Sequence, residues 1–235
     1  MRRTSSDLFY SSCTYTYCAI GVVLMLFPNL VTYYVHRGYS LPPNDATAYQ
    51  YILAATGVYL RAENRFFDVL LPIARCPVRG LAPLEPHFHL KVPRLPGRLL
   101  AAVLVDARQA RQPDGGLNEA LYHFHHDGAR VYVTKPPQQA TATGVLGAES
   151  NVAGLLLDLH SHGAMRAFWS ATDDADEQGF RAYGVIGRLD TRPEIRLRLG
   201  VYGYRFPLPA AALFDGTAPF MDTYGCEKQS AERKI

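Results

Sequence analysis

Residues Leu157–Asp174, LDLHSHGAMRAFWSATDD, contain the feature around which the rest of the chain can be interpreted. The apolar run from Val152 to Leu159 leads into it and is typical of a buried β-strand. In a strand, residues i and i+2 point to the same side of the sheet. His160 and His162 are therefore predicted to present two imidazoles on one face.

A third ligand can come from Asp173. The Ser170-Ala171-Thr172-Asp173 segment is a Ser-x-x-Asp motif of the kind that begins a helix, and further acidic residues follow it. Two histidines and one carboxylate leave a position for water, which is the arrangement of catalytic zinc. Each half of the motif also occurs by chance, as an ordinary helix cap or a pair of strand histidines. Together they predict one zinc ion per chain, held by His160, His162 and Asp173.

The order His-x-His, seven residues, Ser, two residues, Asp resembles the motif of the JAMM/MPN zinc metalloproteases, which act on ubiquitin-like proteins. The resemblance covers Leu95 to Pro209. It implies that the three ligands bind zinc and that Ser170 helps to hold the attacking water or the oxyanion. Many family members have proline after the second histidine, where this chain has Gly163. We expect the glycine to leave the ligand loop freer and to lower the affinity for metal.

The family also needs a glutamate as general base, at the start of a strand that follows a long helix. Glu119 stands 41 positions before His160, between a predicted helix and a predicted hairpin, so the resemblance implies that Glu119 is catalytic. Glu149 is the alternative, but it lies in an apparent loop and is expected to be a surface charge. In this reaction zinc lowers the pKa of its water, and the carboxylate takes the proton and passes it to the leaving amine.

The segments around Glu119 have clear periodicities. Leu99 to Gln112 has apolar residues at helical spacing and ends before Pro113, so it predicts a helix. Glu119 to Phe124 and Ala129 to Thr134 flank Asp127-Gly128, which is a strong hairpin signal.

Two more strands are predicted at Ala182 to Leu189 and Glu194 to Phe206. In the second, Arg196 and Arg198 alternate with apolar residues and are expected to form the solvent-exposed face. Combined with the resemblance, this order predicts an α+β (α/β) fold, a JAMM/MPN-like mixed β-sheet flanked by helices.

The chain of 235 residues can bury a substantial core and is predicted to divide into three parts. Residues 1–93 are expected to form a small β-rich N-terminal domain, with a hairpin that turns at Arg61-Ala62-Glu63. The prolines between Pro83 and Pro96 predict a linker or an edge strand. Residues 94–215 are the predicted metalloprotease domain, and residues 216–235 are a polar C-terminal tail.

Composition favours a cytoplasmic protein. The apolar run Cys18 to Phe27 is shorter than the roughly 20 residues that span a bilayer, and it ends without a signal-peptide cleavage site, so no membrane segment is predicted. The four cysteines form no CxxC pair, which fits a reducing compartment. The net charge of +3 comes without a basic patch of interleaved aromatics, which argues against nucleic-acid binding.

The resemblance leaves three functions open. Within the family the chain is most similar to the bacterial PRTRC system A group, which implies a ubiquitin-like protein or its conjugate as substrate and a ThiF-like adenylating enzyme as partner. The expected activity is that of a deubiquitinase-like peptidase or isopeptidase. The first alternative is a catalytically silent binding or scaffold module, and the second is a hydrolase of cell-wall peptides.

Two further histidine clusters lie in strand-like segments, His87-Phe88-His89 and His123-Phe124-His125-His126. Neither is followed by a serine and an acid at the spacing of Ser170 and Asp173. Both are expected to be surface or half-buried strand histidines, with an accessory metal as the alternative.

Overall fold

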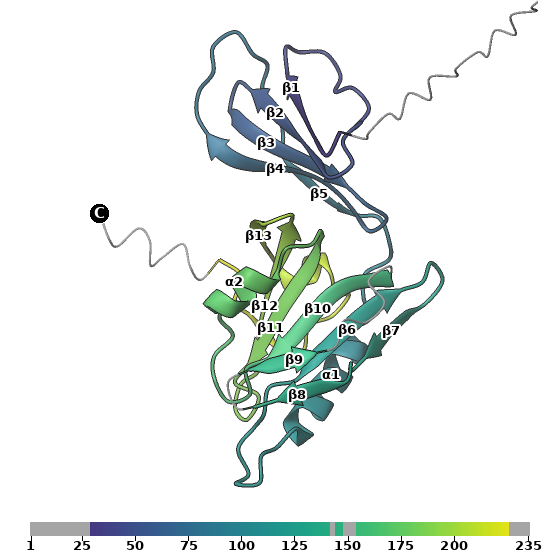
Figure 1. Cartoon of the computed structure of the whole chain (residues 1–235), viewed down its shortest axis with the longest axis vertical. Coiled ribbons are helices and arrows are strands. Elements are labelled where there is room, and N and C mark those ends of the chain that lie inside the picture. The colour runs from purple at the N-terminus through teal and green to yellow at the C-terminus, as the bar shows by residue number, and fades with distance from the viewer. Residues whose placement is uncertain (1–28, 142–143, 148–153, 226–235) are drawn as a thin grey trace, which may run out of the picture.

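The computed structural model describes residues 29–141, 144–147 and 154–225, and in this part the chain forms two larger β-sheets, one above the other (Figure 1). The N-terminal sheet has the order β1-β2-β3-β4-β5. Its β1–β2 pair is parallel and the other pairs are antiparallel. The strands are β1 (Val31–Val35), β2 (Tyr49–Ala54), β3 (Gly57–Glu63), β4 (Phe67–Arg75) and β5 (His87–Leu90).

The predicted turn at Arg61-Ala62-Glu63 is wrong, because these residues lie inside β3. The chain turns instead at Asn64, whose side-chain Oδ1 accepts hydrogen bonds from the backbone N–H groups of Phe66 and Phe67. Asparagine favours such turns because its side chain can bond the backbone two or three residues ahead. The proline-rich segment contains β5, so the prediction of an edge strand there is confirmed.

The second sheet has the order β13-β12-β11-β10-β6-β7, with β14 paired to β12. Its strands are β6 (Leu121–His126), β7 (Val131–Thr134), β10 (Leu155–Ser161), β11 (Arg181–Gly187), β12 (Glu194–Val201), β13 (Tyr204–Leu208) and β14 (Met221–Asp222). The predicted hairpin is confirmed as β6 and β7, and the predicted strand Glu194 to Phe206 divides into β12 and β13. A small separate pair is formed by β8 (Gln138–Ala140) and β9 (Val145–Gly147).

The pairing of β10 with β11 is parallel, whereas β10 pairs with β6 in antiparallel fashion. Parallel neighbours need a crossover connection. Residues 162–180 make this connection and include the short helix α2 (Ala171–Asp176). The crossover therefore returns over the sheet near His160, the next-to-last residue of β10.

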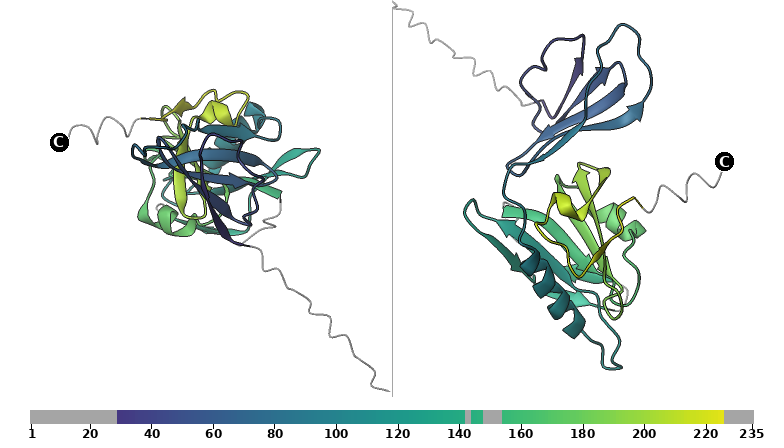
Figure 2. Two further views of the ribbon diagram at one scale, coloured as in Figure 1. Left: turned by 90° about the horizontal axis from the view of Figure 1, so that it is seen from above. Right: turned by 180° about the vertical axis from the view of Figure 1, so that it is seen from behind.

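Helix α1 (Gly97–Gln109) lies on the opposite face of the second sheet from α2 (Figures 1 and 2). It confirms the predicted helix, beginning two residues earlier and ending three residues earlier than expected. Its apolar stripe, Leu100, Val103, Leu104 and Ala107, is buried in the main core. That core also includes buried side chains of the N-terminal sheet, such as Phe67 and Val69.

The predicted α+β fold, a JAMM/MPN-like sheet flanked by helices, is wrong. The described residues are mostly β, and α1 and the six-residue α2 are the α-helices among them, besides one 3-10 turn at Ala210–Ala212. The physical reason is visible in the residue pattern: the α1 segment has helical periodicity, whereas the other apolar segments of the described strands either alternate or form short continuous runs, as buried strands do. The additional helices were expected from the resemblance and not from the residues.

In the described part of the chain no helix combines the length and apolarity that crossing a membrane requires. The apolar run Cys18 to Phe27 and the charged residues from Cys226 onward lie outside the described residues.

Candidate metal centre

Strand β10 brings the two histidines of the motif together. His160 pairs with Leu121 on one side and with Val185 on the other. Its ring contacts Asp173 of the crossover, so it stands on the face that the crossover covers. The backbone N–H of His162 donates to Ile186 O at 2.8 Å, which extends the strand geometry by one residue. The two Nε2 atoms lie 3.1 Å apart, as the i, i+2 spacing predicts.

The carboxylate of Asp173 completes the group. Its Oδ1 lies 3.2 Å from His160 Nε2, and the donor atoms of all three residues lie within 4.8 Å of one another. Ligands at about 2.0–2.1 Å from a tetrahedral zinc ion are separated from one another by about 3.3 Å. The two separations of 3.1 Å and 3.2 Å are close to that edge length, so the donor set is compatible with a tetrahedral zinc ion.

Electrostatics favour the form of the histidines that binds metal. Burial lowers the pKa of both His160 and His162, although the charge of Asp173 acts in the opposite direction. Imidazole ligates metals when it is neutral. At neutral pH both rings therefore have lone pairs available.

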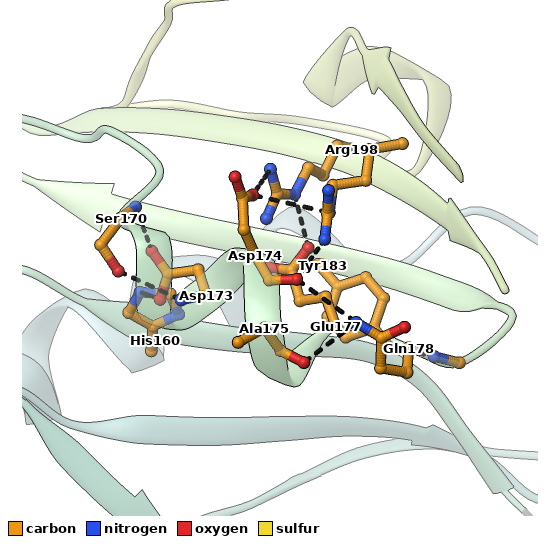
Figure 3. A network of polar contacts seen from close by, with 11 residues as sticks. His160, Ser170, Asp173, Asp174, Ala175, Glu177, Gln178, Tyr183 and Arg198 are labelled. Carbon is orange, nitrogen blue, oxygen red and sulfur yellow. Dashed lines mark hydrogen bonds and ion pairs between the residues drawn. The ribbon is translucent and has the colours of Figure 1, made fainter. Parts of the chain in front are cut away.

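Asp173 is positioned by a capping box at the start of α2 (Figure 3). The Asp173 N–H donates to Ser170 Oγ at 3.1 Å, and the Ser170 N–H donates to Asp173 Oδ2 at 2.6 Å. Ser170 is the N-cap, and Asp173 uses Oδ2 in the capping box while its Oδ1 faces His160 in the candidate metal site. A hydroxyl can accept two hydrogen bonds and donate one, so Ser170 keeps its proton available for another group.

Glu119 lies two residues before β6, in the segment that pairs with Ser161, the residue between the two histidines. Its neighbour Ala120 exchanges hydrogen bonds with Ser161: Ala120 N–H donates to Ser161 Oγ at 2.9 Å, and Ser161 N–H donates to Ala120 O at 2.8 Å. Glu119 is 5% exposed. Burial, and then the charge of Asp173, raise the pKa of Glu119 to about 7. Glu149, the alternative base, lies outside the described residues.

Gly163 has a structural role that differs from the expected loosening of the loop. Its φ is +55°, in the left-handed region where proline cannot lie. Its carbonyl accepts from Leu189 N–H at 3.0 Å, and the Arg188 N–H donates to Met165 O at 2.6 Å. The loop after His162 is therefore tied to the end of β11, and the glycine permits the turn that does this.

We expect Gly163→Ala to lower the free energy of unfolding by about 1–2 kcal/mol, because a left-handed conformation is unfavourable for a residue with Cβ. An added Cβ would also lie 3.0 Å from Leu117 Cβ. Gly163→Pro should cost more, since the ring fixes φ near −65°. Denaturant unfolding measures both, with Gly216→Ala as control because a Cβ there meets open space. Equal stability of Gly163→Pro and the parent would contradict the assigned role.

Arg198 of β12 holds α2 against the sheet, a role that the sequence analysis missed. The prediction that Arg198 belongs to a solvent-exposed face is wrong, because it is 6% exposed. Its Nε donates to Glu177, and its Nη1 lies 2.9 Å from Asp174 Oδ1 (Figure 3). Its guanidinium also stacks 3.8 Å from the centre of the Trp169 ring. Even with this partner, burial raises the pKa of Glu177 to about 7.

The histidines of β6 form a buried polar row beside the centre. His123 lies 3.9 Å from Asp158 Oδ1, and His125 Nε2 lies 3.0 Å from Thr134 Oγ1. Burial lowers the pKa of His123 to about 4. Both residues and His126 are buried, in contrast to the predicted surface or half-buried location.

An open hollow of about 520 Å³ lies next to His162. Phe168, in its wall, packs 4.4 Å from the His162 ring, centre to centre. Its lining combines apolar, cationic and small polar side chains, Ala164, Met165, Arg166, Phe168, Arg188, Asp190 and Thr191.

Comparison with known protein families found no matching family model, and comparison with curated proteins found no similar sequence.

Proposed function

We propose that this protein is a zinc-dependent peptidase or isopeptidase that hydrolyses an amide bond at the C-terminus of a ubiquitin-like protein, the activity of the JAMM-type metalloproteases that its motif resembles. The observation that carries the proposal is the convergence of His160, His162 and Asp173 at the separations of a tetrahedral site, beside a buried carboxyl group. Three protein ligands leave one position open, as in catalytic and not structural zinc sites.

Zinc at this site would supply a Lewis acid and a water that ionises at neutral pH. The residues of the chain then have separate tasks. Glu119, with a pKa raised to about 7, is suited to take up a proton and to release it to the leaving amine, because a general base works best with a pKa near the working pH. The hydroxyl of Ser170 is suited to donate to the oxygen that becomes negative in the transition state.

The hollow beside His162 offers a place for the substrate. Met165 and Phe168 are apolar and are 38% and 41% exposed, and Arg166 and Arg188 add positive charge. An extended C-terminal tail presents main-chain carbonyls and small side chains that suit such a surface. The ubiquitin-like protein and its ThiF-like partner enzyme are proposed from the resemblance of the motif.

The first test is the zinc content of the purified protein after loosely held metal has been removed. We expect about one zinc ion per chain in the parent and close to none in His160→Ala and Asp173→Ala, because two ligands hold zinc only weakly. Thr172→Ala is the matched control, since it changes an exposed residue of α2 next to Asp173.

The same preparations should be tested for cleavage of a ubiquitin-like protein that carries a C-terminal extension. A parent without zinc would refute the metal centre. A zinc-loaded parent that binds the ubiquitin-like protein without cleaving it would identify the silent binding module instead.

A further inference from the structure

A second group of metal-ligand side chains lies on the N-terminal sheet, away from the centre described above. His87 and His89 belong to the edge strand β5, and Asp68 belongs to its neighbour β4. The carboxylate and imidazole donor atoms of these three residues lie within 4.8 Å of one another. The set is again two histidines and one aspartate.

The pairing of β4 with β5 fixes this arrangement. Asp68 lies directly opposite His89, and Leu70 lies opposite His87. The alternate residues of β5, Phe88 and Leu90, pack against the main core. Because side chains alternate along a strand, the burial of these two turns both histidines to the other face of the sheet.

One long hydrogen bond and one longer ion-pair contact join the three side chains. His87 Nε2 lies 3.4 Å from Asp68 Oδ1, and His89 Nδ1 lies 4.0 Å from Asp68 Oδ2. Both distances exceed the usual range of about 2.7–3.2 Å for a good N–H···O hydrogen bond. Each ring has a nitrogen near the Asp68 carboxylate, and the two rings stack at 4.8 Å between centres with planes 23° apart. The three donors thus lie close enough together to share one metal ion.

We propose that Asp68, His87 and His89 form a second, surface site for zinc, which links the edge strand β5 to β4. Imidazole nitrogen with carboxylate oxygen is a donor set that suits Zn²⁺, and also Cu²⁺ and Ni²⁺. The side chains of Asp68, His87 and His89 are 38%, 34% and 69% exposed, so they can adjust to the ion but remain hydrated. This site therefore binds zinc more weakly than the buried centre, and it holds together a short strand at the edge of the sheet.

The site can be tested separately from the proposed catalytic centre. In the full-length His160→Ala/His162→Ala protein, which lacks two ligands of that centre, we expect equilibrium dialysis against zinc chloride to give one zinc ion per chain. Adding His87→Ala and His89→Ala should abolish this binding. The matched control is Glu63→Gln/Lys91→Ala, which removes the ion pair of the adjacent positions on β3 and the end of β5 and leaves the three donors in place.

Two readouts distinguish a built site from nonspecific binding. Cobalt added in place of zinc should give the visible absorption of a nitrogen- and oxygen-coordinated ion in the background protein and in the control, and not after removal of His87 and His89. Zinc should also raise the melting temperature of the background protein and of the control, but not that of the protein without His87 and His89. Zinc binding that is unchanged without the two histidines, or no binding in the background protein, would overturn the proposal without bearing on the centre at His160.

Discussion

Glu119→Gln should lower the rate of amide cleavage by about 10²- to 10⁴-fold while zinc stays bound, because the amide cannot accept the proton that a general base takes. Glutamine has nearly the same shape as glutamate, so the buried position next to Ala120 should remain filled. The measurement is the cleavage rate of a ubiquitin-like substrate together with zinc content. Loss of cleavage with retained zinc separates proton transfer from metal binding.

The control for this experiment is Glu149→Gln, which replaces the competing carboxylate. We expect it to cleave at the rate of the parent. If cleavage instead survives in Glu119→Gln and disappears in Glu149→Gln, the base has been assigned to the wrong residue. If both variants lose zinc, the two carboxylates support metal binding and do not serve in proton transfer.

Arg198→Ala should lower the free energy of unfolding by about 3–5 kcal/mol at neutral pH, the cost of removing one partner from a buried ion pair. Glu177 is 5% exposed and would remain without its guanidinium partner. The variant should also bind zinc more weakly, since Arg198 anchors the helix that carries Asp173. Denaturant unfolding and zinc competition measure the two effects.

The loss of stability in Arg198→Ala should depend on pH in a defined direction. Burial already raises the pKa of Glu177 above its ordinary value, and without Arg198 it should rise further. A carboxyl group with a higher pKa in the folded state binds more protons when folded, so stability falls as pH rises through that range. The stability of the variant should therefore be closest to that of the parent near pH 5 and furthest below it near pH 8.

Two variants test this explanation. Arg196→Ala, two residues away on β12 and less buried, should cost less than about 1 kcal/mol. Arg198→Met/Glu177→Gln should recover much of the loss, because no buried charge is left. An Arg198→Ala protein as stable as the parent at pH 8 would show that the pair contributes little.

The pairing of His160 with His162 and the capping box of Asp173 could be predicted from the sequence because their geometry is local. His160 and His162 are related by the repeat of a strand, and Asp173 by the three-residue spacing of a capping box. Helix α1 and the β6–β7 hairpin were predictable for the same reason, since Leu100 to Ala107 and Asp127-Gly128 are local signals. Local sequence signals thus predict most of the helices and strands around the candidate metal site.

What could not be predicted depends on which strands become neighbours. Alternation along β12 correctly separates Arg198 from the apolar residues, but nothing local shows that α2 covers that face. Asp68 lies 19 positions before His87, and only the β4–β5 register brings them together. The prediction of flanking helices was wrong for another reason. It was inferred from a short motif, and a motif specifies a site without specifying the fold around it.

The double use of Asp173 has a thermodynamic consequence. Its Oδ2 accepts from the Ser170 N–H in the capping box and its Oδ1 faces His160, so the order of α2 and any metal held by His160, His162 and Asp173 would be linked through one side chain. Such linkage is reciprocal, and it needs no contact between the two binding events. A molecule that prefers one arrangement of α2 would change the affinity for metal by the same factor by which the metal changes the affinity for that molecule.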